Sequence, residues 1–292
     1  MNRRDFLKKG AYATAGTLAG ASVLSSMFGV TGCTPAAAAP KIVGLQLYSL
    51  RDAMGQDVPG TLKKVADMGY KNLETAGYSD GKIYGMAPLE FKKMAEDLGM
   101  QVSSAHLGRG YEAEKDAEIM EWWKVAMDAQ AAVGCRYAIQ ASFPIGETLD
   151  SIKVYSDYFN RLSEMAATKG LKFGFHNHAR EFEKRDGVVI EDYLIENSAP
   201  NMLFELDVYW ATKGGVSPVD YINKYGNKIQ VLHIKDESII GDSGTIDFEP
   251  IFNAAYAKGM KDYYVEVERY TLPAEVCVQK SFDFLDAAAY VK

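Results

Sequence analysis

One pattern constrains the fold of this chain more than any other feature: from residue 41 onward, short apolar runs alternate with longer amphipathic segments. The short runs predict eight strands, at residues 41–48, 72–77, 101–107, 135–142, 171–178, 202–209, 229–235 and 262–268. The segments between them predict eight helices, at residues 58–69, 87–98, 114–133, 148–169, 188–198, 217–226, 248–259 and 273–290.

Strict alternation of strands and helices predicts a parallel sheet, because each return to the same edge needs a crossover helix. Eight such units in roughly 250 residues are typical of a closed (β/α)8 barrel. The alternative is an open doubly wound sheet, which normally carries a glycine-rich phosphate turn after its first strand. Residues 48–52 read YSLRD and lack that fingerprint. We therefore predict a single α/β barrel domain over residues 41–292.

The start of the chain predicts an export signal rather than part of the fold. Arg3 and Arg4 precede a weakly apolar run, rich in Ala, Gly and Ser, that continues to Val30. This arrangement resembles a twin-arginine signal. We predict a signal peptide over residues 1–32, followed by a short tether over residues 33–40.

Cys33 follows the predicted signal in the sequence Val-Thr-Gly-Cys, which resembles a bacterial lipobox. We therefore predict that Cys33 is lipidated and that the mature protein is an exported, membrane-tethered lipoprotein. The alternative is simple cleavage within residues 36–39, which would leave a soluble periplasmic protein.

Charge and cysteine content exclude two classes of protein. The chain has a formal net charge of −7, and loss of residues 1–32 removes four basic residues and one acidic residue, which leaves −10. A surface of that sign opposes the phosphate backbone of nucleic acids, so we expect no nucleic-acid partner. Cys135 and Cys277 are the cysteines that remain in the domain, too few for a disulfide framework.

Polar residues gather where the predicted strands end, and barrels of this type form their active sites at the C-terminal ends of the strands. These residues are Gln46, Tyr48, Glu74, His106, Gln140, His176, His178, Glu205, Asp207, Tyr209, His233, Lys235, Glu266 and Glu268. All four histidines of the chain are among them. Alternate residues of a strand share a face, so we expect His176 and His178 to point the same way, and likewise Glu205, Asp207 and Tyr209.

Charged groups on inward strand faces are costly unless they are paired or bound to a metal. Imidazoles with carboxylates form the ligand set of a divalent cation such as Mn²⁺, Zn²⁺, Fe²⁺ or Co²⁺. Mg²⁺ fits less well, because it favours oxygen donors. The alternative is a ring of buried ion pairs that closes the mouth of the barrel.

Five motifs in order resemble the sugar phosphate isomerase/epimerase group of the xylose-isomerase-like TIM barrels. They are GLQLYSLR at residues 44–51, FHNH at 175–178, ELDVYW at 205–210, LHIKD at 232–236 and VEVE at 265–268. The resemblance covers nearly the whole chain from Lys41 onward. It implies a TIM barrel with one divalent metal, a small-molecule carbohydrate as substrate and a homodimer.

The resemblance also implies the metal ligands, which come from strands five to eight of the family and are typically Glu, Asp, His and Glu. By position they fall on His176, Asp207, His233 and Glu266. His176 departs from the pattern, because a sugar epimerase presents Glu there. The resemblance therefore supports the metal more strongly than it supports epimerisation.

Roles for the other residues follow from the same chemistry. Glu266 is the predicted general base, and His178 and Lys235 are predicted to donate a proton or hold a hydroxyl. Glu181 is predicted to orient His178. Contacts to the sugar are predicted for Gln46, Tyr48, Glu74, His106, Tyr209 and Trp210.

The predicted function is a metal-dependent isomerase or epimerase that acts on an unphosphorylated sugar through a metal-stabilised enediolate. Export favours an unphosphorylated substrate, since phosphorylated sugars are mainly cytoplasmic. The alternative is a lyase or hydratase on a keto-sugar or keto-glycoside, which needs the same proton abstraction. A non-catalytic sugar-binding lipoprotein is a further alternative. An abasic-site nuclease is disfavoured by the acidic surface and by export.

Overall fold

A computed structural model describes residues 41–292, which belong to one compact unit. The predicted signal peptide over residues 1–32, the tether over residues 33–40 and the lipidation site Cys33 lie outside the described residues. Between residues 41 and 292, no helix is both long enough and apolar enough to cross a membrane.

Eight strands close into a barrel in the order β1, β12, β11, β10, β7, β6, β5, β2. Their bounds are β1 Gly44–Gln46, β2 Asn72–Thr75, β5 Gln101–Leu107, β6 Tyr137–Gln140, β7 Lys172–His176, β10 Leu203–Asp207, β11 Ile229–Lys235 and β12 Asp262–Glu266. Neighbouring barrel strands are parallel throughout. The predicted (β/α)8 barrel is confirmed, and the open sheet is excluded.

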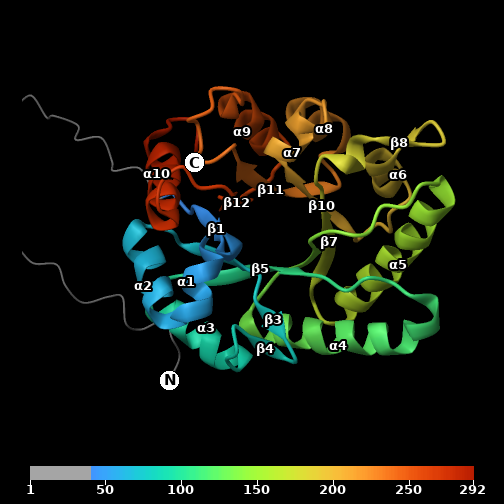
Figure 1. The fold of residues 1–292 in the computed structure, drawn as a ribbon, viewed down its shortest axis with the longest axis horizontal. Helices are drawn as coiled ribbons and strands as arrows, with labels where there is room; N and C mark the ends of the chain where they lie inside the picture. The colour runs from blue at the N-terminus through green and yellow to red at the C-terminus, as the bar shows by residue number, and fades with distance from the viewer. Residues whose placement is uncertain (1–40) are drawn as a thin grey trace, which may run out of the picture. The chain divides into compact units, whose positions relative to one another are not determined.

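The helices surround the ring of strands (Figure 1). Eight of them match the predicted segments: α2 Val58–Met68, α3 Pro88–Asp97, α4 Asp116–Val133, α5 Leu149–Thr168, α6 Ile190–Glu196, α8 Pro218–Tyr225, α9 Phe248–Ala257 and α10 Ala274–Ala287. Two short helices, α1 Arg51–Gln56 and α7 Val208–Lys213, were not predicted. Three 3-10 turns accompany them: η1 Leu47–Leu50, η2 Ala113–Lys115 and η3 Arg180–Phe182.

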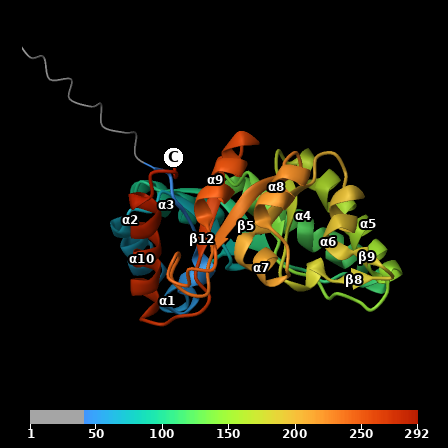
Figure 2. The same ribbon diagram turned by 90° about the horizontal axis from the view of Figure 1, so that it is seen from above.

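Two small hairpins interrupt the alternation. One pairs β3 Tyr78–Ser79 with β4 Lys82–Ile83, and the other pairs β8 Lys184–Arg185 with β9 Val188–Val189. Both turns are Asp-Gly, and Asp80 and Asp186 have φ of 50° and 51°, which is the conformation that two-residue hairpin turns require. The first hairpin lies beside α4 (Figure 1), and the second lies beside α6 (Figure 2).

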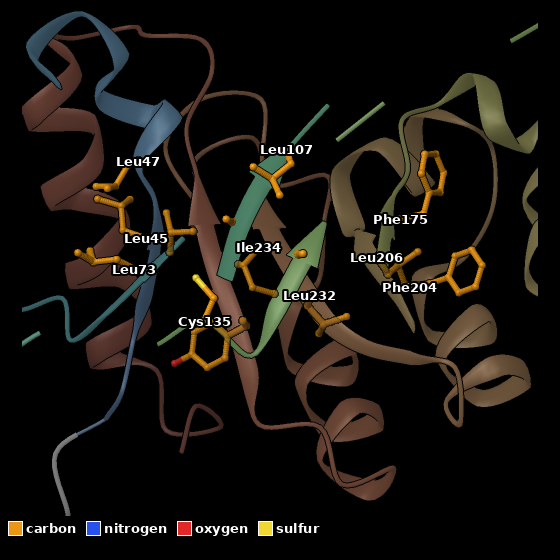
Figure 3. Close-up of a cluster of buried hydrophobic side chains, with 14 of the residues drawn as sticks. Leu45, Leu47, Leu73, Leu107, Cys135, Phe175, Phe204, Leu206, Leu232 and Ile234 are labelled. Atoms are coloured by element: carbon orange, nitrogen blue, oxygen red, sulfur yellow. The ribbon is translucent and has the colours of Figure 1, made fainter. Parts of the chain in front are cut away.

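Alternate strand residues build two apolar layers. One set, which includes Leu45, Leu73, Leu232 and Ile234, packs in the large core that the strands share with the helices (Figure 3). The other set, Tyr137, Ile139, Leu203, Val231 and Tyr264, forms a separate cluster inside the barrel. Gly174 leaves room for that cluster, since a Cβ there would lie 2.5 Å from the Leu203 side chain. The barrel is thus a packed core rather than a pore.

Six of the eight barrel strands end two residues earlier than predicted, and side-chain hydrogen bonds account for two of these ends. β1 stops at Gln46, because its side-chain Oε1 accepts a hydrogen bond from the Tyr48 N–H at 3.0 Å and so begins η1. β10 stops at Asp207, whose Oδ1 accepts from the Trp210 N–H at 2.8 Å and caps α7. The prediction that Tyr209 shares a strand face with Asp207 is therefore wrong, because Tyr209 lies in α7.

Candidate active site

In two neighbouring barrel strands, the inward positions change from apolar to charged toward the carboxyl end. In β10 the order is Leu203, Glu205, Asp207, and in β11 it is Val231, His233, Lys235. Register places Asp207 beside His233. Glu205, Asp207 and His233 are fully buried. Because buried charges need partners or a metal, this end of the barrel is the candidate site.

The structure brings together the four residues that the sequence nominated as metal ligands. One side-chain atom from each of His176, Asp207, His233 and Glu266 lies within 4.8 Å of the others. His176 Nε2 is 3.5 Å from Asp207 Oδ2, and His233 Nδ1 is 3.5 Å from Glu266 Oε2. His176 Nε2, Asp207 Oδ2 and His233 Nδ1 have no hydrogen-bond partner although they are buried. Three unpartnered donor atoms that converge in this way fit a divalent cation.

The orientations of the two histidine rings suit that use. His176 Nδ1 lies 3.3 Å from the Ala141 carbonyl oxygen, which can only accept, so Nδ1 carries the hydrogen and Nε2 presents its lone pair. His233 Nε2 lies 2.6 Å from Glu74 Oε2, which leaves Nδ1 facing the cluster. A carboxylate behind a metal-site histidine is the usual arrangement that orients the ring.

Glu74 is held from several sides below the cluster. It accepts hydrogen bonds from Gln46 Nε2 at 2.6 Å and from Ser104 Oγ at 2.5 Å, in addition to its contact with His233. Burial opposes ionisation of Glu74, but the attraction of His106 and His233 outweighs burial and lowers the pKa of this carboxyl to about 2. Gln46 and Glu74 are fully buried, so in this structure they support His233.

His106 joins the same layer from β5. Its Nε2 lies 2.7 Å from Glu205 Oε2 and 3.3 Å from Glu74 Oε2. Burial raises the pKa of Glu205 well above its usual range, and repulsion from Glu74 raises it further. Glu74 and Glu205 therefore share one negative charge, which limits the free-energy cost of burying both carboxyl groups.

Lys235 joins two carboxylates at the end of β11. Its Nζ lies 2.9 Å from Glu266 Oε2 and also pairs with Glu268. Burial opposes ionisation of Glu266, but Lys235 and His233 outweigh it and bring the pKa of this carboxyl well below its usual range. Burial likewise opposes the charge on Lys235, yet Glu266, Asp207 and Glu268 raise its pKa. Glu266 is therefore an ionised carboxylate within the four-residue cluster.

Asn177 stands between the two histidines of the FHNH motif and links two strands. Its Oδ1 accepts from the Asp207 N–H at 3.0 Å, and its Nδ2 lies 3.4 Å from the Asp207 carbonyl oxygen. Asn177 is fully buried, so it fixes Asp207 relative to His176. The sequence analysis did not assign this role to Asn177, although its position between the two histidines of the motif could have drawn attention to it.

His178 lies beyond the end of β7, so strand alternation does not set its direction. Its ring centroid is 5.0 Å from that of His176, with the two planes at 84°. Burial, followed by repulsion from His176, lowers the pKa of His178 to about 3 and keeps its imidazole neutral. Glu181 does contact His178, but through the backbone: its Oε2 accepts from the His178 N–H at 2.9 Å.

A cavity of about 440 Å³ opens above these residues. Predicted site residues in its lining are Tyr48, His106, His176, His178 and Glu266. Lys235, Tyr209 and Trp210 do not line it, although Lys235 Nζ lies 5.2 Å from the centre of the Trp210 ring. Sequence reasoning missed Tyr78 and Trp122 and gave Glu268 no role; all three line the cavity. The Asp-Gly turn after Tyr78 was a usable signal for the hairpin that carries it.

Residues 62–288 match the family described as Xylose isomerase-like TIM barrel. Inosose dehydratase from Geobacillus kaustophilus (strain HTA426) is 24% identical over 219 residues, which cover 63% of this chain and 66% of that relative. Inosose dehydratase from Geobacillus thermodenitrificans (strain NG80-2) is 27% identical over 161 residues, 47% of this chain and 52% of that relative. The chain thus matches only about half to two thirds of the length of these curated relatives.

Solved structures with a similar fold agree with this family match. A sugar phosphate isomerase/epimerase from Parabacteroides distasonis ATCC 8503 is 38% identical, with a TM-score of 0.81 over 86% of this chain and 100% of that chain. L-ribulose 3-epimerase is 17% identical, with a TM-score of 0.67 over 83% of this chain and 92% of that chain, a likeness in fold alone. The resemblance inferred from the sequence is confirmed. By the match over most of its length, the chain belongs to the xylose isomerase-like TIM barrel family.

Proposed function

We propose that this protein is a divalent-metal-dependent lyase that acts on a sugar carrying a ketone and eliminates an oxygen substituent from the β-carbon. The observation that carries the proposal is the position of His176, whose unpartnered Nε2 points into the cluster where an epimerase would present a carboxylate. Glu266 is then the one carboxylate among the described residues that both belongs to the cluster and lines the cavity. On this ground we rank the lyase, which was the alternative expected from the sequence, ahead of the isomerase or epimerase.

His176, Asp207, His233 and Glu266 would hold the cation. When bound there, a divalent cation supplies Lewis-acid polarisation of a sugar carbonyl. The mixed nitrogen and oxygen donors favour Mn²⁺, Zn²⁺, Fe²⁺ or Co²⁺ over Mg²⁺. Ligand nitrogens must be deprotonated, so cation binding at His233 would compete with a proton.

Elimination needs one base, and the chain offers one in the right place. Glu266 would accept the proton from the carbon next to the carbonyl, and the C–H electron pair would form the enolate double bond. As the carbonyl re-forms, a carbon–carbon double bond would form between the α- and β-carbons and the β C–O bond would break. The departing oxygen would take the proton that Glu266 carries. Epimerisation would instead need a second group to return a proton to the opposite face.

Two neighbours support Glu266 in this role. Lys235 holds the carboxylate in place through the 2.9 Å contact and would stabilise its charge before the proton arrives. His178, neutral and part of the cavity lining, would donate a ring N–H to the departing oxygen. Neither role requires a change of protonation state.

The cavity lining supports an unphosphorylated substrate. Among the described residues that line it, none is Lys or Arg, whereas Glu266 and Glu268 both face it. A phosphate group would meet two carboxylates with no cation from these side chains to offset them. Export of the mature protein, which we also propose, agrees with such a substrate.

The names of the relatives include both reactions that can follow proton abstraction, elimination and epimerisation. Inosose dehydratase from G. kaustophilus is a dehydratase by name, which favours elimination. The P. distasonis structure at 38% identity is described as an isomerase/epimerase, which keeps epimerisation as the second candidate. Binding without catalysis is the outcome if neither reaction occurs.

Solvent deuterium separates these functions. The metal-loaded protein is incubated in D₂O with a methyl glucoside oxidised to the ketone at C3, so that C2 carries the acidic hydrogen and C1 the β-oxygen. Release of methanol with a C1–C2 double bond, followed by NMR, is the expected result. Deuterium at C2 with no methanol would indicate epimerisation. If neither methanol release nor deuterium incorporation is observed, the assignment of this protein as an enzyme is overturned. Glu266→Gln is expected to abolish either reaction.

A further inference from the structure

Four residues of the cavity lining carry large aromatic or aliphatic side chains: Tyr48, Tyr78, Leu107 and Trp122, which we call the aromatic wall. They lie at or after the carboxyl ends of β1, β2 and β5, which are neighbours in the barrel. The polar lining comes mainly from the strand ends, where His106, His176 and Glu266 would engage a carbonyl and hydroxyls. An unsubstituted hexose offers this wall only the C–H groups of its ring faces, because nearly every carbon carries an oxygen. Pockets of about 300–1,000 Å³ commonly bury ligands larger than a single sugar ring.

Trp122 is held rigidly on α4. Its ring meets Tyr78 edge to face, with centroids 5.4 Å apart and planes at 83°. It also meets the buried Trp123 edge to face at 5.2 Å, and the Arg109 guanidinium lies 5.7 Å from its centre. These contacts fix the indole while leaving it half-buried and in the cavity lining.

Tyr78 is held by its hairpin. Its hydroxyl accepts a hydrogen bond from the Gly81 N–H at 3.2 Å, within the tight turn at Asp80 and Gly81. Tyr48, on η1, is 43% exposed and has the Arg51 guanidinium 4.8 Å from its ring centre. Rings that are positioned before a ligand arrives lose little entropy on binding, which is the property of a recognition surface.

The geometry points to the aromatic wall as a subsite for a flat, uncharged aromatic group joined to the sugar through the oxygen that is released. This inference rests on the proposed function and deepens it: the substrate class is an aryl glycoside bearing a ketone on its sugar. Offset or edge-to-face packing against Trp122 and Tyr78 would hold the aryl ring. Glu266 and Glu268 in the same lining oppose an anionic substituent.

Binding of unoxidised glucosides tests the subsite without catalysis, because they lack the ketone that acidifies the neighbouring C–H. Dissociation constants of phenyl and methyl β-glucoside for the purified metal-loaded protein are measured by calorimetry. The phenyl compound is expected to bind about tenfold more tightly, since an aromatic contact with its buried area contributes on that order. Equal affinities, or no binding of either compound, would overturn the inference.

Substitutions at Trp122 test whether the aromatic wall causes the difference in affinity between the phenyl and methyl glucosides. Trp122→Ala is expected to bring the phenyl-to-methyl ratio close to one, and Trp122→Leu is tested as well in case the smaller side chain prevents folding. Val125→Ala, on the same helix and 43% exposed, is the matched control and should keep the ratio. A ratio that survives both substitutions at Trp122 would overturn the subsite.

Turnover is measured separately, as release of phenol or methanol from the phenyl and methyl glucosides oxidised to the ketone at C3. A binding preference for phenyl with no release of phenol or methanol would retain the subsite and overturn the lyase. Release of phenol and methanol at equal kcat/KM, together with equal affinities, would retain the lyase and overturn the subsite.

Discussion

Lys235 and Glu266 form a buried ion pair between neighbouring barrel strands. Residue pairing sets them side by side in β11 and β12, and their charged atoms are 2.9 Å apart. The Lys235 side chain is 2% exposed and that of Glu266 is 5% exposed. Because Lys235 also pairs with Glu268, one cation serves two carboxylates at the mouth of the barrel.

Loss of Lys235 should therefore lower both stability and activity. Lys235→Met is expected to reduce the free energy of unfolding by about 3–5 kcal/mol, because it leaves a buried carboxylate without its partner. Turnover should fall by about 10²-fold or more. Urea unfolding gives the first quantity. Lys124→Met, at an exposed ion pair, is the control and should change stability by under about 1 kcal/mol; an equal loss in both variants would contradict this account.

Metal content should depend on the unpartnered donor atoms of the cluster. His176→Ala and Asp207→Asn are each expected to lose most of the one bound equivalent, as measured by elemental analysis after dialysis. Asp262→Asn removes a carboxylate at the other end of β12, where it pairs with Arg136, and should retain the metal. Full metal content in either cluster variant would refute the ligand assignment.

Glu74 should tune metal affinity although it is not one of the four proposed ligands. Glu74→Gln would weaken the contact that orients His233, and loss of such a partner typically costs 10- to 100-fold in metal affinity. Competition with a chromophoric chelator measures the change. An affinity equal to that of the wild type would show that His233 is oriented by other contacts.

Glu191 should make stability depend on pH. It is 2% exposed, and its Oε2 has no hydrogen-bond partner. Burial, followed by repulsion from Glu181, raises its pKa well above the usual range. As pH rises above the unfolded-state pKa of about 4.3, the unfolded chain loses this proton while the folded chain keeps it, so stability falls.

Glu191→Gln is accordingly expected to stabilise the protein by about 1–3 kcal/mol at neutral pH, with the gain vanishing below about pH 4. Thermal unfolding across this pH range measures it. The exposed Glu90→Gln variant should stay within about 0.5 kcal/mol of the wild type at every pH. A gain that does not change with pH would exclude titration of Glu191 as the cause.

Export and lipidation are tested in cells. Cys33→Ser is expected to leave the precursor unprocessed and to prevent lipid attachment, which fractionation and mass spectrometry of the mature N-terminus detect. Unchanged membrane association would refute the lipobox, and cleavage within residues 36–39 would indicate a soluble periplasmic protein.

Local signals in the sequence determined the fold. Apolar runs and amphipathic segments alternate with the periods of strands and helices, and each barrel strand falls within its predicted range. Capping side chains also fix where helices begin: the Thr148 Oγ1 accepts a hydrogen bond from the Ser151 N–H at the start of α5. Because parallel strands bring their carboxyl ends together, the same reasoning placed the polar strand-end residues on one rim. The family resemblance then picked out the four residues of the cluster.

Tertiary structure decided which atoms those residues present and what surrounds them. The hydrogen bond from His233 to Glu74 crosses the barrel between residues 159 positions apart, a distance along the chain that no local pattern spans. In the sequence, nothing distinguishes Trp122 from other residues of an amphipathic helix. The packing of α4 against the β3–β4 hairpin places it in the cavity lining. Periodicity records which way a side chain faces from its own element, whereas its partners depend on how elements distant in sequence pack together.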